Sequence, residues 1–236
     1  MFLPADPIAA FTHLLGALAC VGAAPSLVAR GQTLHARVAL AVFAASAVLL
    51  LLASGAFHSM THDTPTREVF KRLDHAAIFV LIAGSFTPIH AVLFRGWLRW
   101  GVLVPIWVAA IAGVALKTIF FESIPYWVGV TVYLTMGWVG GLSFAFLIAR
   151  RGFRYTSPLL LGGLAYTVGA VCEFTGEPSL IPGVFESHEV FHVMVLLGLM
   201  GMWAFMHRAV DDYPDATQLP RTQRPLPMPP SDAPGL

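Results

Sequence analysis

Seven apolar stretches, each long enough to cross a lipid bilayer, constrain the fold of this chain more than any other feature. A bilayer core about 30 Å thick is spanned by about 20 apolar residues in a helix. Such stretches lie between charge clusters and helix breakers at residues 8–29, 36–60, 73–94, 98–119, 124–149, 156–173 and 188–207. The sequence therefore predicts an all-α integral membrane protein, built as a seven-transmembrane-helix bundle.

The composition excludes a water-soluble globular protein. Hydrophobic residues make up 57% of the chain and charged residues 11%, against about 25% charged residues in a typical soluble domain. The net charge is +1, so the chain lacks the basic surface that a nucleic acid partner would need, and membrane lipid is the expected partner. Cys20 and Cys172 lie far apart in apolar stretches, so we expect them to pack rather than to pair.

The chain divides into a membrane domain and a tail. We expect residues 1–208 to form the seven-helix transmembrane domain and residues 209–236, which are rich in proline, to form a disordered C-terminal tail. No basic residue precedes the first apolar stretch, so we expect a retained helix rather than a cleaved signal peptide. Glycines are candidates for close helix approaches, at positions 137, 140, 141, 162, 163 and 169.

Ionisable and hydroxyl side chains gather at one end of the predicted bundle. If the helices alternate in direction, the starts of the odd-numbered helices and the ends of the even-numbered ones share a membrane face. An ionisable side chain inside a membrane helix costs on the order of 3 kcal/mol or more, so a shared location indicates a common polar site. The residues on this face are Thr12, His13, Ser54, His58, Asp74, His75, Glu173, His188, Glu189 and His192.

The spacing of three histidines is typical of a metal site. His188 and His192 are four residues apart, so their imidazoles project from one helix face about one turn apart. Ser54 and His58 have the same spacing at the end of the second helix. Three neutral imidazoles from two helices can hold a tetrahedral zinc ion and leave one position for water. For a single histidine, contact with lipid headgroups is the better interpretation, but this interpretation does not suit three histidines on one face. Among the other histidines, His75 is the nearest competitor for a ligand role.

The segment HEVFH at 188–192 also matches the zincin pattern, in which two histidines bind zinc and the intervening glutamate acts as a base. No third zincin ligand follows in a soluble catalytic domain, and the segment opens a membrane helix. We therefore set the zincin interpretation aside. Glu189 lies about 100° around the helix from His188, and solvation at the membrane interface is its expected role.

Three motifs together carry a family resemblance. They are SGAFHSM at 54–60, LDHAAIFVLIAGSFTP at 73–88 and SHEVFHVMVLLG at 187–198. With these motifs in this order the chain resembles the bacterial hemolysin III proteins, which belong to the progestin and adiponectin receptor family, itself grouped with the alkaline ceramidases. The resemblance covers about residues 6–207.

The resemblance implies roles for individual residues. The Ser-x-x-x-His and His-x-x-x-His motifs match Ser54 with His58 and His188 with His192, which implies a zinc ion (Zn²⁺) bound by the three histidines. The aspartate that opens the third helix matches Asp74, and the resemblance implies that it lies with the serine near the zinc-bound water.

This chain departs in one place from the first-helix pattern of the family. The pattern usually has an acid, an asparagine and Thr-His, and the corresponding residues here are Asp6, Ala9, Thr12 and His13. The asparagine is absent, so a hydrogen-bonding role at position 9 is not expected, although the implied zinc ligands are complete.

Zinc held by three histidines lowers the pKa of its bound water to about 7, which supplies hydroxide for attack on a carbonyl. The resemblance to ceramidases implies a lipid amide as substrate. We therefore expect a zinc-dependent membrane hydrolase acting on a lipid amide or ester, with Asp74 as the base or water-orienting group and Ser54 as a hydrogen-bond donor.

Two alternatives belong to other classes. One is a receptor-like or membrane-homeostasis protein without turnover, in which zinc is structural. A water-filled fourth coordination position would favour the enzyme, and a closed site would favour structure. The other, implied by the family name, is a cytolysin. A cytolysin would normally be soluble before it enters a foreign membrane, and the composition of this chain excludes a soluble form.

Charge near the helix ends predicts the orientation. The polar face carries four lysines and arginines and the opposite face eight. The positive-inside rule therefore predicts a cytoplasmic C-terminus and an outward-facing polar site in a bacterial cell (inner) membrane. Resemblance to the eukaryotic receptors implies the opposite orientation. We prefer the charge count because the loops are short, which is where the rule holds best.

Overall fold

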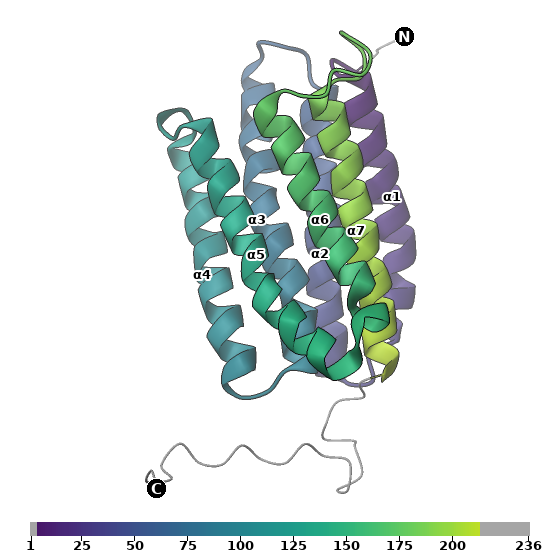
Figure 1. Cartoon of the computed structure of the whole chain (residues 1–236). Coiled ribbons are helices and arrows are strands. Elements are labelled where there is room, and N and C mark those ends of the chain that lie inside the picture. The colour runs from purple at the N-terminus through teal and green to yellow at the C-terminus, as the bar shows by residue number, and fades with distance from the viewer. Residues whose placement is uncertain (1–3, 213–236) are drawn as a thin grey trace, which may run out of the picture.

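Seven helices, each long and apolar enough to cross a membrane, run side by side in the computed structural model, which describes residues 4–212 (Figure 1). The predicted fold class is confirmed, and no strand occurs within this described range. The helices are α1 (Pro7–Ala29), α2 (Leu34–Ser59), α3 (Pro65–Leu93), α4 (Trp97–Ile119), α5 (Tyr126–Arg151), α6 (Phe153–Thr175) and α7 (Ser187–Asp212), with a turn of 3₁₀ helix, η1 (Phe121–Ser123), between α4 and α5.

Two helices extend beyond the apolar stretches that predicted them. α3 begins eight residues before the predicted position 73, because Thr64 accepts a hydrogen bond from the backbone N–H of Arg67 and Pro65 occupies the first helical turn, where its missing N–H costs nothing. The helix therefore begins before the apolar run does. α7 continues to Asp212, so residues 209–212 are helical, and the rest of the predicted tail lies outside the described residues.

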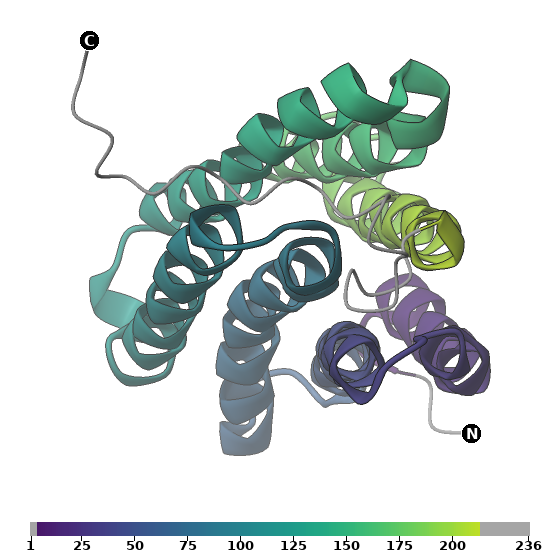
Figure 2. The same cartoon turned by 90° about the horizontal axis from the view of Figure 1, so that it is seen from below.

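The helices alternate in direction, so the arrangement of ends assumed for the polar face is correct (Figure 1). Most consecutive helices pack as neighbours, most extensively α2 on α3 and α6 on α7, and α7 also packs on α1 (Figure 2). α4 and α5 are the exception, because each packs on α3 instead. Phe43, Leu51 and Phe205 are fully buried in the larger apolar cluster. Phe79 of α3 and Ile106 of α4 belong to a second cluster on the α4 side. The last helix thus closes the bundle against the first.

Glycine brings α6 and α7 into backbone contact. A Cβ atom added at Gly162 would lie 2.8 Å from the carbonyl oxygen of Gly198, and one added at Gly201 would lie 2.7 Å from that of Pro158. Small residues permit this kind of approach in membrane bundles. The close approach expected at Gly162 is present, whereas nothing lies within 4 Å of a Cβ at Gly163.

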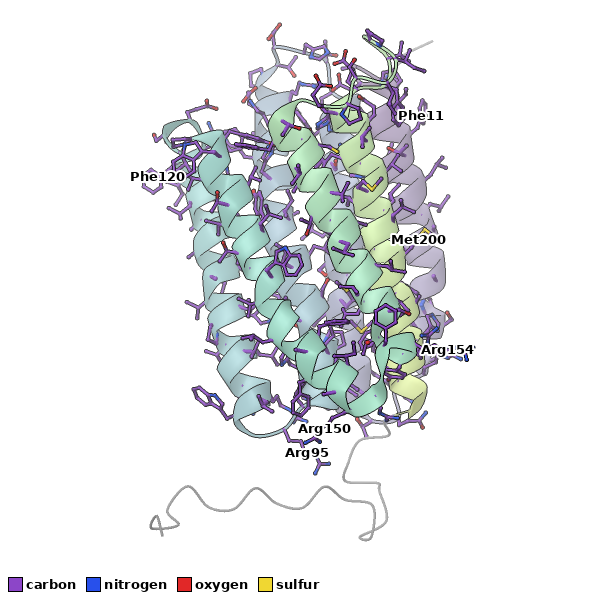
Figure 3. All side chains as sticks on the ribbon, in the orientation of Figure 1. Phe11, Arg95, Phe120, Arg150, Arg154 and Met200 are labelled. Atoms are coloured by element: carbon purple, nitrogen blue, oxygen red, sulfur yellow. The ribbon has the colours of Figure 1, made fainter. Side chains whose placement is uncertain are left out.

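The outer surface of the bundle is apolar. Large side chains such as Leu18, Val108, Leu142 and Leu161 are more than half exposed. An apolar surface of this extent marks a face that contacts lipid rather than water. Arg95, Arg150 and Arg154 lie at the end of the bundle away from the start of α1 (Figure 3).

Both cysteines are free, as expected. Cys20 is buried in the larger apolar cluster, and Cys172 is partly buried on α6.

Candidate metal centre

Three histidines converge at the polar end of the bundle. His58 lies in the last turn of α2, and His188 and His192 lie in the first two turns of α7. One ring nitrogen from each lies within 4.8 Å of the others, and His58 and His192 are each only 2% exposed. The structure therefore brings together the three side chains that the helical spacing singled out.

Two of these imidazoles are held by carboxylates. His58 donates from Nδ1 to Oδ2 of Asp6 at 2.9 Å, and His188 donates from Nδ1 to Oε2 of Glu173 at 3.1 Å. An ionised carboxylate only accepts hydrogen bonds, so the hydrogen of each neutral ring is placed on Nδ1. The Nε2 atom of each ring therefore presents a lone pair.

These two Nε2 atoms face one another at 3.2 Å. Two lone pairs at this separation repel unless a proton or a metal cation lies between them. Ligand nitrogens of a tetrahedral zinc ion, with bonds of about 2.0 Å, are separated by roughly 3.3 Å. The donor set and the spacing therefore fit zinc.

His192 is held differently from the other two histidines. Its ring stacks on that of His13, with centroids 3.8 Å apart and an angle of 21° between the planes. The Nδ1 atom of His192 is buried and makes no hydrogen bond of good geometry within residues 4–212. Ring stacking, rather than a carboxylate, therefore limits the orientation of this side chain.

Asp6 links the histidine cluster to the end of α2 and the start of α3. Its Oδ2 accepts a 2.6 Å hydrogen bond from Nη2 of Arg67, and its backbone N–H donates to the carbonyl of His58 at 3.0 Å. The Arg67 guanidinium also donates to the carbonyls of Phe57 and Met60. Burial raises the pKa of Asp6, but the hydrogen bonds from Arg67 and His58 more than offset this, so its pKa lies below the ordinary value.

Asp74 and Ser54 lie beside the histidines rather than among them. Both line a cavity that also reaches His188 and His192. Asp74 lies close enough to the Ser54 hydroxyl and to His188 for both to interact with its carboxyl group. The two residues given catalytic roles from the family resemblance thus face the same enclosed space as the candidate ligands.

Two other candidates have local partners instead. His75 donates from Nδ1 to the carbonyl of Lys71 at 2.8 Å and places its ring edge against Phe121. Glu189 accepts a hydrogen bond from the backbone N–H of Glu186 at 2.9 Å, which satisfies a donor at the start of α7. Neither belongs to the histidine cluster.

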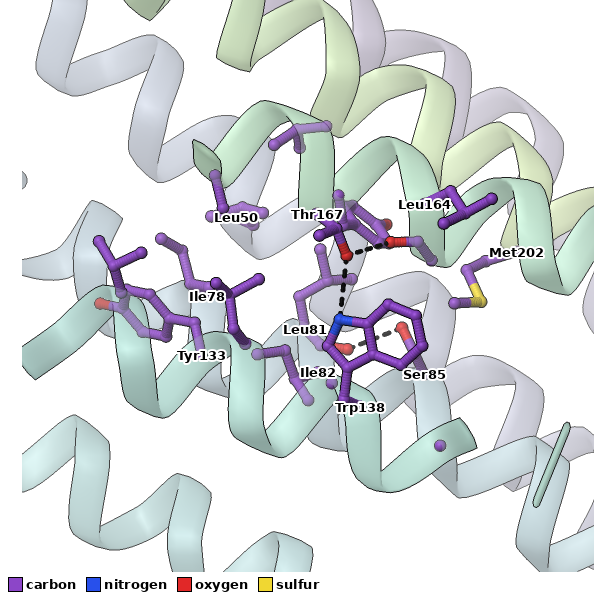
Figure 4. A pocket seen from close by; sticks show the side chains of 18 of the residues that line it. Leu50, Ile78, Leu81, Ile82, Ser85, Tyr133, Trp138, Leu164, Thr167 and Met202 are labelled. Atoms are coloured by element: carbon purple, nitrogen blue, oxygen red, sulfur yellow. Dashed lines mark hydrogen bonds between the residues drawn. The ribbon is translucent and has the colours of Figure 1, made fainter. Parts of the chain in front are cut away.

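The cavity continues from the histidines deep into the bundle. It has a volume of about 230 Å³ and extends along α3 from Asp74 to His90, a distance of about 24 Å at 1.5 Å per residue. Its walls are mainly apolar, and α5, whose interior has no acidic, basic or histidine side chain, contributes Tyr133 and Trp138 (Figure 4). Other lining residues include Leu50, Ile78, Leu81, Ile82, Leu164 and Met202.

His90 and Ser143 form the polar far end of this cavity. His90 donates from Nδ1 to the carbonyl of Leu98 at 2.9 Å. Its Nε2 is therefore an acceptor, and Ser143 donates to it at 3.0 Å. Phe86 and Phe94 each stack on the His90 ring.

Several features of the site were not predicted from the sequence. Asp6 and Glu173 received no role, although both are acids at the polar face, and Arg67 and Tyr126 were not singled out. The shared membrane face was the available signal, because an acid near three histidines is a natural partner for an imidazole N–H. The cavity had no signal, since it arises from how the helices pack.

Comparison with known proteins supports the resemblance drawn from the motifs. The family described as "Haemolysin-III related" matches residues 3–203. The "Hemolysin-3 homolog" of Bacillus subtilis (strain 168) is 33% identical over 86% of this chain and 93% of its own length. "Hemolysin-3" of Bacillus cereus is 35% identical over 80% of this chain and 84% of its own length. The "Adiponectin receptor protein" of Drosophila melanogaster is 28% identical over 84% of this chain and 48% of its own length.

Proposed function

The chain belongs to the haemolysin-III related family, and from this premise we propose that it is an integral membrane hydrolase that uses zinc to cleave a lipid amide or ester. One observation carries the proposal. Two imidazoles held by carboxylates present Nε2 atoms to one another at 3.2 Å, and this cluster borders an apolar cavity whose wall also contains Asp74 and Ser54.

The chemistry divides between the metal and the protein. When bound by His58, His188 and His192, zinc supplies Lewis acidity that polarises a carbonyl and lowers the pKa of a water to about 7. Asp74 takes the proton that the attacking water gives up and returns it to the departing amine or alcohol. Ser54 lines the same wall as Asp74, and its hydroxyl is the donor that would hold the Asp74 carboxyl group in place.

The cavity supports a lipid as the substrate. Its walls are mainly apolar over about 24 Å of helix α3, from Asp74 near the histidines to His90. A hydrocarbon chain lying in this space would direct its carbonyl group toward the polar end. Burial of the chain supplies binding free energy of about 0.8 kcal/mol per methylene, which holds the scissile bond beside Asp74.

Metal analysis combined with a lipid screen tests this proposal. Protein purified in detergent is assayed for zinc and for hydrolysis of a panel of lipid amides and esters, in parallel with His188→Ala. We expect about one zinc per chain and release of fatty acid by the wild type, and loss of both in the variant. Hydrolysis that persists in His188→Ala, or a wild type that binds zinc without turning over any of the panel, would contradict the proposed activity.

A receptor-like protein with a structural zinc is the second candidate. It is supported by the 28% identical Drosophila melanogaster relative, which is named an adiponectin receptor. Zinc bound by the three histidines, without hydrolysis of any lipid in the panel, is the result that would favour this candidate over the hydrolase.

The charge distribution supports an orientation with the C-terminus in the cytoplasm and the histidine cluster toward the outside. The short connections at the arginine-rich end carry most of the positive charge, which the positive-inside rule assigns to the cytoplasm. We propose the bacterial inner membrane as the location. The residues counted at this end are Arg30, Arg37, Arg95, Arg99, Arg150, Arg151, Arg154 and Arg208, against Arg67, Lys71, Arg72 and Lys117 at the other.

A further inference from the structure

We infer that Glu173 and Asp6 are positioning residues, which determine that His188 and His58 present Nε2, and not Nδ1, to a bound metal. This inference rests on the metal site proposed above. It goes further by assigning a role to two carboxylates that contact the candidate ligands without belonging to the ligand set.

Glu173 is held from two sides at the end of α6. Its Oε2 accepts the hydrogen bond from Nδ1 of His188 at 3.1 Å, and its Oε1 accepts one from the hydroxyl of Tyr126 at 3.2 Å. Tyr126 is the first residue of α5, and His188 is the second residue of α7. The carboxylate therefore connects three helices and has both oxygens occupied.

Asp6 is held as firmly on the other side of the cluster. Arg67 donates to the same Oδ2 that accepts from His58, at 2.6 Å. The backbone N–H of Asp6 also bonds the carbonyl of His58 at 3.0 Å. The carboxylate is thus fixed relative to the backbone of the residue whose ring it orients.

These contacts determine the tautomer of each ring. A neutral imidazole carries one hydrogen, on either nitrogen, and an acceptor at Nδ1 selects the form with the lone pair on Nε2. A carboxylate on the far nitrogen also raises the basicity of the ligating one, and loss of such a partner typically lowers metal affinity by about 10- to 100-fold. Both rings of the facing pair carry this partner.

An alternative role for the same carboxylates is to connect helices, without any effect on the metal. Side-chain chemistry separates the two roles. Glutamine and asparagine keep an oxygen that can accept from Nδ1 but lose the charge, whereas alanine removes the acceptor. A positioning role therefore predicts partial rescue by the amide, and an altered ligand field at the metal in each variant.

The matched control is Glu189→Gln. Glu189 also carries a charge that acts on His188, but its carboxylate bonds the backbone N–H of Glu186 and not the ring. The amide keeps that backbone contact. The control thus removes a nearby negative charge and leaves both imidazole partners in place.

The experiment measures metal affinity in full-length protein purified in detergent. Zinc affinity is determined by competition with a chelator, and the visible absorption of the cobalt-substituted protein reports the ligand geometry, for wild type, Glu173→Ala, Glu173→Gln, Asp6→Ala, Asp6→Asn and Glu189→Gln. We expect the alanine variants to bind zinc about 10- to 100-fold more weakly, the amide variants to lie between these and wild type, and the control to match wild type.

The outcomes separate this inference from the proposed function. Alanine variants with wild-type zinc affinity and cobalt spectrum would overturn the inference alone. A wild type that binds zinc without hydrolysing lipid would overturn the hydrolase and leave the inference standing, and a wild type that binds no zinc would overturn both. If the alanine variants fail to fold, Glu173→Gln and Asp6→Asn test the inference in their place. Wild-type zinc affinity and a wild-type cobalt spectrum in both amide variants would refute a positioning role.

Discussion

Replacing Ser143 with alanine should destabilise the bundle through a single hydrogen bond at the far end of the cavity. Ser143 on α5 donates to Nε2 of His90 on α3, and His90 is only 1% exposed. The other ring nitrogen donates to the carbonyl of Leu98, so the ring has no spare hydrogen for Nε2. The variant therefore leaves a buried acceptor without a donor.

The expected cost follows from this geometry. A buried polar group left without its partner costs about 1–3 kcal/mol, whereas interhelical hydrogen bonds in membrane proteins contribute about 0.6 kcal/mol on average. Stacking of the buried His90 ring against two aromatic rings limits relaxation, so we expect a loss of about 1–2 kcal/mol for Ser143→Ala. α3 packs far less on α5 than on α4, which leaves few other contacts to compensate.

Unfolding in mixed detergent micelles, followed by circular dichroism, measures the free energy of unfolding. Ser85→Ala is the matched control, because Ser85 lines the same cavity and donates only to the carbonyl of Leu81 within its own helix, a bond whose loss is nearly neutral. The double variant Ser143→Ala, His90→Phe should recover part of the loss, because both polar partners are then absent. If Ser143→Ala is no less stable than Ser85→Ala, the assignment of Nε2 as a buried acceptor is wrong.

Three further predictions concern the site and its orientation. His188→Ala and His192→Ala should each remove most of the bound zinc measured by elemental analysis, whereas His207→Ala, at the opposite end of the bundle, should keep it; stoichiometric zinc in the double histidine variant would refute the site. Asp74→Asn should keep the metal and abolish lipid hydrolysis, because an amide of the same shape cannot accept the proton of the attacking water; loss of zinc together with activity would make Asp74 a ligand. A reporter active only in the cytoplasm, fused at the C-terminus, should be active, and activity of an externally active reporter there would reverse the orientation.

The sequence predicted the helices well because a lipid-spanning stretch is a local property of composition. It predicted the meeting of His58 with His188 and His192 because alternating helices place the end of α2 and the start of α7 at one face. It placed the start of α3 at residue 73 instead of Pro65, since hydropathy marks where lipid begins and not where backbone hydrogen bonding does. The contact between Glu173 and His188 depends on helix crossings and side-chain rotamers, which no single stretch of sequence encodes.

The glycine contact between α6 and α7 makes the candidate metal ligands sensitive to changes far from them. Gly198 lies ten residues after His188, about 15 Å along α7, and the backbones at the contact leave no room for a methyl group. A side chain at Gly162 would act as a wedge, and α7 would tilt about it and carry His188 away from Glu173. A genetic screen for loss of function should therefore recover alleles at Gly162 and Gly201 whose histidines are all intact, and second-site suppressors should reduce the size of the side chains facing them.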